Sequence, residues 1–335
     1  MNTLLPQDAL FDGNAEPWTS LPVCDHYAGI EKRMIKSLEM QAEMGPVFDV
    51  TLDAEDGAPI GGENDHIELI ASIVNSKANL YNRVGSRVHP VTHPAFENDV
   101  RMLFKHGISR LAYLMLPKAR NLDDVRNAIA FISRCADEAN APLPPLHALI
   151  ETHGALHDVW SIAGLAQIQS LSFGLMDFVS AHGGAIPAQG MGAQGQFTHP
   201  LVVRAKLEIA ASCHAHGKTP SHSVITEFNN ADIVFAAARK ASQQFGYTRM
   251  WSIHPSQIRP IVDAFKPDLV EINDACQILM LAYQNNWAPI RYKSEGQDSL
   301  HDRASYRYYW HILRRAKQTG CALPQEVEHL FFEHQ

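Results

Sequence analysis

Charged residues follow several short apolar runs of the sequence, which is where the active site of an α/β enzyme can assemble. The set comprises Asp53, Glu55 and Asp56 after residues 47–52, Arg87 and His89 at the end of 84–89, Lys118 after 110–116, Glu151 after 146–150, and Asp177 after 168–173. A charge beside a buried strand is costly unless it is paired or binds a cation. If the runs are parallel strands of a barrel, their carboxyl ends meet on the face that carries activity.

Two of these acids, Glu151 and Asp177, end neighbouring predicted strands. Paired carboxylates with room for water suit Mg²⁺, a hard cation that keeps part of its hydration shell. The alternative for each acid taken alone is a salt bridge at the rim of the fold. Because charged residues end four successive strands, we favour a functional site.

The elements that must position these residues alternate between short apolar runs and amphipathic stretches. The predicted strands are 19–24, 47–52, 84–89, 110–116, 146–150, 168–173, 219–225 and 248–253, and the predicted helices are 28–44, 63–77, 94–106, 121–139, 154–163, 200–216, 229–244 and 255–264. Eight strands alternating with helices over roughly 250 residues predict an α/β fold of the TIM (β/α)8 barrel type. An open doubly wound sheet is the alternative, since alternation alone does not separate the two.

The strands are expected to stop after residue 267. Residues 268–285 and 303–318 have helical patterns, joined by a connection at 286–302. We therefore predict a catalytic barrel domain over 1–266 and a C-terminal helical extension over 267–335.

Composition and sequence patterns argue against a nucleic-acid-binding, a secreted or a membrane-spanning protein. The 335 residues are 46% hydrophobic and 19% charged, with a net charge of −8, which disfavours binding to nucleic acid. The five cysteines are scattered and include no C-x-x-C, which favours a reducing compartment. We find no secretory signal and no apolar run near 18 residues, and so expect a cytoplasmic protein that does not span a membrane.

Six short motifs, in order between about residues 30 and 265, resemble those of the citrate lyase β-subunit-like family within the HpcH/HpaI aldolase superfamily. They are L-D-A-E-D at 52–56, S-R-V at 86–88, L-P-K at 116–118, L-I-E-T at 149–152, F-G-L-M-D-F at 173–178 and S-I-H-P-S-Q-I at 252–258. A seventh segment, L-H-D-R at 300–303, resembles the M-I-D segment of the C-terminal extension in that family.

The resemblance implies a TIM barrel lyase that makes or breaks a carbon–carbon bond beside a carbonyl. It implies that Glu151 and Asp177 hold Mg²⁺ or Mn²⁺, and that Arg87 binds an oxo acid or the developing enolate oxygen. It also implies that Asp302 reaches the active site of a neighbouring subunit in a homo-oligomer, a trimer or hexamer, with the extension swapped between subunits. The implied substrates are CoA thioesters of hydroxy acids, such as citryl-CoA or malyl-CoA.

These residue types agree with that chemistry. A divalent ion and an arginine stabilise the negative charge that develops on an enolate oxygen. We expect Lys118, Glu55 and Asp56 to orient Arg87 or water at the metal. Asp302 is expected to act as a general acid or base, or to gate water.

Two other functions remain open. Lys118 could form a Schiff base in a metal-independent aldolase, or the barrel could bind an oxo acid without turnover.

The sequence also departs from the family pattern. Residues 18–25 lack the usual R-S, and His89 stands where the family has Asn. The usual acidic residue after the seventh strand is missing, with Pro220-Ser221-His222-Ser223 in its place. These departures leave the substrate and CoA recognition open. The G-x-G-x-x-G at 190–195 lacks a preceding strand, so we interpret 179–199 as a loop that covers the site.

Overall fold

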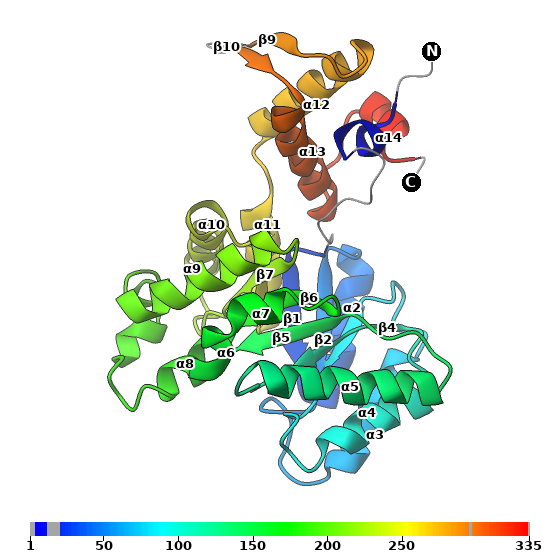
Figure 1. The fold of residues 1–335 in the computed structure, drawn as a ribbon, viewed down its shortest axis with the longest axis vertical. Coiled ribbons are helices and arrows are strands. Elements are labelled where there is room, and N and C mark those ends of the chain that lie inside the picture. The colour runs from blue at the N-terminus through cyan, green and yellow to red at the C-terminus, as the bar shows by residue number, and fades with distance from the viewer. Residues whose placement is uncertain (1–3, 12–20, 295–296, 334–335) are drawn as a thin grey trace. The chain divides into compact units, whose positions relative to one another are not determined.

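The computed structural model describes residues 4–11, 21–294 and 297–333. The chain divides into two compact units, one over residues 19–264 and one that joins the first 18 residues to 265–335. The larger unit contains a closed parallel barrel in which eight strands follow one another in sequence order (Figure 1). The predicted (β/α)8 architecture is therefore confirmed, and the open doubly wound sheet is excluded.

The barrel strands are short, and their residues are almost all buried. They are β1 (Cys24–Ala28), β2 (Phe48–Asp53), β3 (Val84–Arg87), β4 (Leu111–Leu116), β5 (Leu146–Ile150), β6 (Ile168–Phe173), β7 (Thr219–His222) and β8 (Arg249–Ser252). Parallel pairing of each strand with the next brings the carboxyl ends of the strands to one face of the barrel, and Asp53 is the direct register partner of Arg87.

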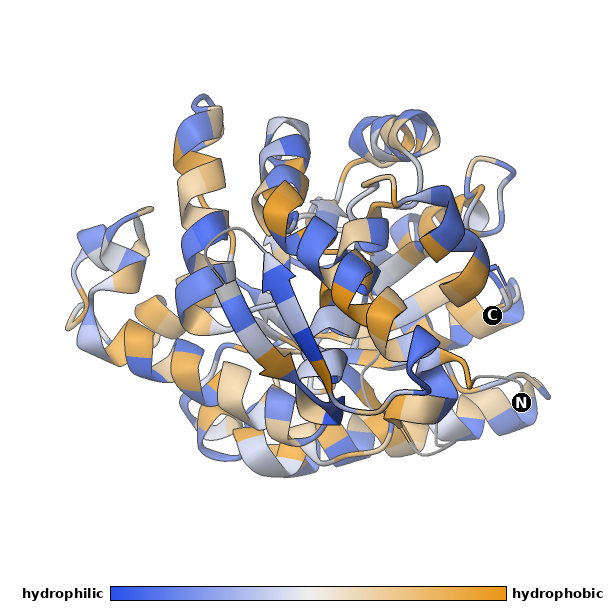
Figure 2. Cartoon of the chain, turned by 90° about the horizontal axis from the view of Figure 1, so that it is seen from above, coloured by the Kyte–Doolittle hydropathy of each residue, from blue (hydrophilic) through white to orange (hydrophobic). Residues whose placement is uncertain are grey.

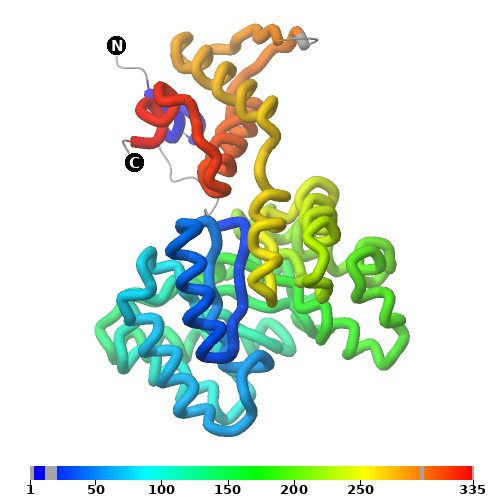
Figure 3. Tube along the Cα trace, turned by 180° about the vertical axis from the view of Figure 1, so that it is seen from behind, coloured from blue at the N-terminus to red at the C-terminus, as the bar shows by residue number. Residues whose placement is uncertain are grey.

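Helices connect the strands and carry both hydrophobic and hydrophilic residues (Figure 2). They are α2 (Glu31–Met44), α3 (Glu63–Val74), α4 (Phe96–Lys105), α5 (Leu122–Glu138), α6 (His153–His157), α7 (Val159–Ala163), α8 (Leu175–Ser180), α9 (Pro200–Ala215), α10 (Ala231–Phe245) and α11 (Ile258–Phe265), with 3₁₀ turns η1 (Ala188–Met191), η2 (Gly195–Phe197) and η3 (Pro255–Gln257). Helix α2 is an example of an amphipathic helix that buries one face. Its buried residues include Met34 and Leu38, and it lies beside β1 and β2 (Figure 3).

The first strand was predicted at 19–24, which is wrong, because β1 begins at Cys24; residues 19 and 20 lie outside the described part of the chain. The barrel interior explains the error. Arg249 is fully buried there, with its guanidinium 3.2 Å from Asp25 and 2.5 Å from Asp49. Because β1 places Asp25 against this buried cation, the strand lacks the apolar run by which the others are recognised.

The smaller unit is built on α1 (Pro6–Leu10), α12 (Leu269–Gln284), α13 (Arg303–Gln318) and α14 (Gln325–Phe331). Its core contains Leu10 of α1 together with Leu279 and Trp310, so the N-terminal helix packs with the C-terminal helices. The expectation that no strand follows residue 267 is wrong: β9 (Ile290–Ser294) and β10 (Gln297–His301) form an antiparallel pair. The residues of β9 alternate between buried and exposed, so the sequence there lacks the continuous apolar run that indicates a barrel strand. In the described residues, no helix is long and apolar enough to cross a membrane.

Candidate functional site

Arg87 is held rigidly at the carboxyl end of β3. Its Nε donates to Asp53 Oδ1 at 2.7 Å and its Nη2 to Oδ2 at 2.5 Å, while Nη1 lies 3.2 Å from Glu55 Oε2. The guanidinium is 5.3 Å from the centre of the Tyr27 ring, and the residue is only 6% exposed. Two carboxylates fix this cation in one orientation, which prepares its remaining N–H groups to bind an anion.

Asp53 is itself fixed by the turn that follows β2. The backbone N–H groups of Glu55 and Gly57 donate to its two carboxylate oxygens, each at 2.9 Å. A Cβ at position 57 would lie 2.3 Å from Asp53 Oδ2, so glycine is required for this close approach. The sequence grouped Asp53 with Glu55 and Asp56, but it did not single out Asp53 as the bidentate partner of Arg87. The D-x-x-x-G spacing is the signal that could have shown it.

The ammonium of Lys118 joins three acids that follow two different strands, β2 and β6. Its Nζ lies 2.5 Å from Glu55 Oε1, 2.7 Å from Asp56 Oδ1 and 3.9 Å from Asp177 Oδ1. Burial opposes the charge on this amine, but the ion pairs with Asp56 and Glu55 outweigh it and raise the pKa of Lys118. Lys118 is therefore a firmly charged ammonium whose neighbours were all predicted site residues.

Glu151 follows β5 and is buried, with 2% of its surface exposed. The backbone N–H of Lys118, a residue at φ 49°, donates to Glu151 Oε1 at 2.6 Å. On the other side, a Cβ at Gly174 would lie 2.2 Å from Glu151 Oε2, so the glycine that follows β6 leaves room for the carboxylate. Burial and the nearby charge of Asp177 raise the pKa of Glu151 to about 8.

Asp177 lies on α8 with its side chain 44% exposed, so a buried acid and an accessible one share this part of the rim. The acids around Arg87 and Lys118 outnumber these two cations: they are Asp53, Glu55, Asp56, Glu151 and Asp177. Burial raises the pKa of Glu55 as well, in spite of Arg87 and Lys118. This part of the protein therefore has an excess of negative charge that a divalent cation would relieve.

The donor set fits Mg²⁺ better than a transition metal. Among the described residues, no group of three or more His, Cys, Asp or Glu side chains forms a complete metal cage. Mg²⁺ is commonly bound through one or two carboxylates with water and substrate in its other positions. Lys118 contacts Glu151 through its backbone N–H and approaches Asp177 with its ammonium, so both acids lie in the same part of the rim. Their predicted role as metal ligands stays a prediction.

An apolar cluster lies beside Arg87 in the barrel. It consists of Tyr27, Met115, Leu149, Val224 and Trp251. Tyr27 connects it to the charged groups, since its ring packs on Trp251 at 4.6 Å and faces the guanidinium of Arg87. Such a surface lowers the local dielectric constant and strengthens the interactions of a charged substrate.

The structure thus brings together Arg87, Glu55, Asp56, Lys118, Glu151 and Asp177, all of which were predicted from the sequence. Asp302 belongs to the smaller unit, where its Oδ1 accepts hydrogen bonds from the backbone N–H groups of Ala304 at 3.0 Å and Ser305 at 3.3 Å. It is the N-cap of α13. Its predicted catalytic role stays a prediction.

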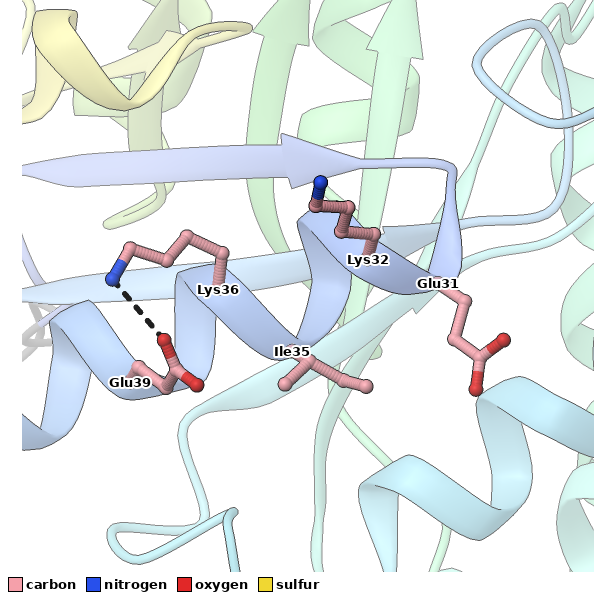
Figure 4. A pocket seen from close by; sticks show the side chains of 5 residues that line it. All are labelled: Glu31, Lys32, Ile35, Lys36 and Glu39. Atoms are coloured by element: carbon pink, nitrogen blue, oxygen red, sulfur yellow. Dashed lines mark hydrogen bonds and ion pairs between the residues drawn. The ribbon is translucent and has the colours of Figure 1, made fainter.

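A surface hollow elsewhere on the barrel unit lies along α2 and is not a comparable site. It is lined by Glu31, Lys32, Ile35, Lys36 and Glu39, all from one helix (Figure 4). Lys36 and Glu39 pair at 3.1 Å and are more than half exposed. Solvated charges of this kind show none of the burial that marks the rim site.

A barrel with a charged constellation at the carboxyl ends of its strands defines the chain as a (β/α)8-barrel enzyme. The profile of the HpcH/HpaI aldolase/citrate lyase family matches residues 33–255. The chain belongs to this family, whose members are carbon–carbon lyases.

Solved structures agree with the assignment. A citrate lyase from Burkholderia xenovorans LB400 is 50% identical, with a TM-score of 0.83 over 98% of this chain and 100% of that chain. CitE from Mycobacterium tuberculosis is 18% identical, with a TM-score of 0.64 over 89% of this chain and 99% of that one. RipC from Yersinia pestis is 20% identical, with a TM-score of 0.57 over 77% and 100%. The last two share the fold. The comparison with curated proteins found no match.

The raised pKa of Glu151 predicts how stability depends on pH when metal is absent. The carboxyl favours its protonated form more in the folded state, where its pKa is about 8, than at its ordinary value of 4.5. Its contribution to stability is therefore complete below about pH 4.5 and is lost as the pH rises towards 8, by up to ~1.4 kcal/mol per pH unit. Glu151→Gln removes this loss, so the unfolding free energy of the variant relative to wild type should increase by ~1 kcal/mol or more between pH 5.5 and 7.5.

Urea unfolding in EDTA at the two pH values measures this difference. The matched control is Glu138→Gln, which changes an exposed glutamate of α5 that pairs with Arg101 at 3.2 Å. Its difference from wild type should stay flat. An equally flat difference for Glu151→Gln would show that Glu151 is ionised in the folded protein at neutral pH.

Proposed function

We propose that this protein is a Mg²⁺-dependent carbon–carbon lyase that cleaves or forms a β-hydroxyacyl-CoA, or a related hydroxy acid, through an enolate. The observation that carries the proposal is the buried Glu151 beside Asp177, in a rim where acids outnumber the cations Arg87 and Lys118. Such an arrangement is unfavourable without a cation and fits one that is small and hard.

The ligands of related proteins support the same class of reaction. CitE from Mycobacterium tuberculosis has been solved with magnesium, acetoacetate and coenzyme A, and the citrate lyase β subunit from that organism with oxaloacetate and magnesium. These ligands comprise a hard cation, oxo acids and the carrier of an acyl group. They are the components that a lyase acting on hydroxyacyl-CoA substrates handles.

Glu151 and Asp177 would hold Mg²⁺ in the proposed reaction. When bound, Mg²⁺ supplies Lewis-acid stabilisation of negative charge on substrate oxygen atoms. The chain prepares this position: the backbone N–H of Lys118 orients one oxygen of Glu151, and Gly174 leaves the second oxygen room. Lys118 holds Glu55 and Asp56 in place through its ammonium.

Arg87 would bind the carboxylate of the oxo acid or the enolate oxygen. Asp53 and Glu55 fix its guanidinium before substrate arrives, so no reorganisation is needed when charge develops. The apolar cluster around Tyr27 and Trp251 keeps water from the reacting centre and from a basic enolate carbon.

We extend the proposal to the smaller unit and to assembly. Residues 267–335 would act as an extension swapped between subunits of a homo-oligomer, a trimer or hexamer, and Asp302 would serve a neighbouring active site as acid, base or gate. Asp302 is exposed at the start of α13, and the backbone N–H groups of Ala304 and Ser305 orient its carboxylate, which supports a role for this residue outside its own unit.

The metal pair predicts a specific pattern of activity loss. EDTA should abolish cleavage of citryl-CoA or malyl-CoA by the wild type, and Mg²⁺ or Mn²⁺ should restore it. Glu151→Gln and Asp177→Asn should each lower kcat/KM by at least ~100-fold and weaken Mg²⁺ binding, while circular dichroism shows an intact fold. Asp123→Asn, at an exposed acid on α5, is the matched control. Full activity of either metal-site variant would refute the proposed function.

The Schiff-base alternative makes an opposite prediction for Lys118. Its ammonium is paired with Glu55 and Asp56, and its pKa is raised, whereas a Schiff-base lysine must be an uncharged nucleophile. Borohydride reduction in the presence of pyruvate or oxaloacetate should therefore leave the mass of the protein unchanged. A stable adduct at Lys118, together with activity in EDTA, would favour the metal-independent aldolase.

A further inference from the structure

His89, which follows β3, forms a buried pair with an aspartate of α4. Its Nδ1 lies 2.7 Å from Asp99 Oδ2, and its backbone N–H donates to the same oxygen at 2.9 Å. Asp99 is fully buried, and in the described part of the chain its Oδ1 has no hydrogen-bond partner. A carboxylate placed in this way fixes the tautomer of the imidazole, with the proton on Nδ1.

The plane of the ring is also fixed. The ring of His93 stacks on that of His89, with the ring centres 4.4 Å apart and the planes within 14°. The side chain of His89 is 11% exposed, so part of it stays accessible. No residue that the structure describes forms a hydrogen bond with His89 Nε2. Nε2, on the side of the ring away from Asp99, is therefore available to a ligand. A carboxylate on one ring nitrogen and a reacting group at the other is the arrangement of histidines that act as general acids and bases.

This pair belongs to the neighbourhood of Arg87. His89 follows Arg87 by two residues, and the backbone between them is held by the bond from Val88 N–H to the carbonyl of Met115, at 3.3 Å. Glu55, which contacts Arg87, also acts electrostatically on His89. The mechanism proposed above assigns this imidazole no task, although the reaction has to move a proton.

We propose that His89 is the proton-exchanging residue of this site and that Asp99 is its positioning residue. The inference rests on the proposed lyase function. In cleavage, His89 Nε2 takes the proton of the β-hydroxyl group. The carbon–carbon bond breaks, its electron pair passes into the thioester to form the enolate, and the former hydroxyl carbon becomes the carbonyl of the oxo acid. His89 then returns the proton to the enolate carbon, so the step needs no further reactant. Asp302 is left with the gating role.

The charges around His89 suit a base that works near neutral pH. The hydrogen bond with Asp99 raises the pKa of His89, against a smaller lowering by burial, and Glu55 and Glu63 raise it further. Two other titratable groups lie near His89. His93 belongs to the same loop and stacks on it. Asp124 of α5 lines a small hollow together with His89 and is paired with Arg120 at 2.8 Å. Cleavage should therefore increase with pH through the pKa of His89, because only the uncharged imidazole accepts a proton.

The first experiment compares variants in Mg²⁺-dependent cleavage of malyl-CoA or citryl-CoA. His89→Gln should lower kcat by ~100-fold or more with little change in KM and unchanged Mg²⁺ binding. Asp99→Asn should shift the acid limb of the kcat/KM profile to lower pH, because it removes the charge that raises the pKa of His89. His106→Gln is the matched control, since His106 pairs with Glu68 at 3.7 Å at the opposite end of α4. Wild-type turnover by His89→Gln would overturn the proposal.

The second experiment does not depend on turnover and separates this inference from the proposed function. Imidazole resonances of labelled wild-type protein are titrated with and without Mg²⁺ and oxaloacetate, and His89 is assigned with the His89→Gln variant. An anion bound at Arg87 should raise the pKa of His89 and leave that of His106 unchanged. If the wild type shows no lyase activity but this shift occurs, the lyase proposal fails and the placement of His89 at the site stands. An unchanged pKa of His89 overturns the placement.

Discussion

The mutual repulsion of acids at one end of a barrel is the constraint on which the site depends. Glu151 is buried beside Asp177, and burial together with that neighbour raises the pKa of Glu151 to about 8. Arg87 and Lys118 relieve this repulsion only in part. Arg87 lowers the pKa of Glu151, and the Lys118 ammonium lies 3.9 Å from Asp177, but both side chains are already paired with other acids, namely Asp53, Glu55 and Asp56. The fold therefore maintains an unfavourable charge arrangement that only protonation or a cation neutralises.

The barrel makes this arrangement possible through backbone geometry. Asp53 and Arg87 are register partners on neighbouring strands, so their pairing follows from the sheet itself. Glycines at 57 and 174 let carboxylates approach the backbone where any side chain would collide. The polar pairing of Arg249 with Asp25 and Asp49 inside the barrel keeps its interior from being a continuous apolar core.

The sequence predicted the barrel, most of its strands and the members of the rim site, because buried parallel strands ending in charged residues leave a local signal. It misplaced β1 because Asp25 and His26 interrupt the apolar pattern, and their partners, Arg249 and Ser252, are more than two hundred residues away. It missed the β9–β10 pair because exposed strands alternate in polarity. It did not find the pairing of His89 with Asp99, since a contact between a strand end and the next helix has no sequence signature.

Calorimetric titration of the metal-free protein with Mg²⁺ at pH 7, in two buffers of different ionisation enthalpy, tests the central claim most directly. Because the pKa of Glu151 is about 8, the carboxyl is mostly protonated at pH 7, and binding should release about one proton per Mg²⁺. The proton release should vanish in Glu151→Gln. Binding with no proton release, or equal binding by that variant, would contradict the account.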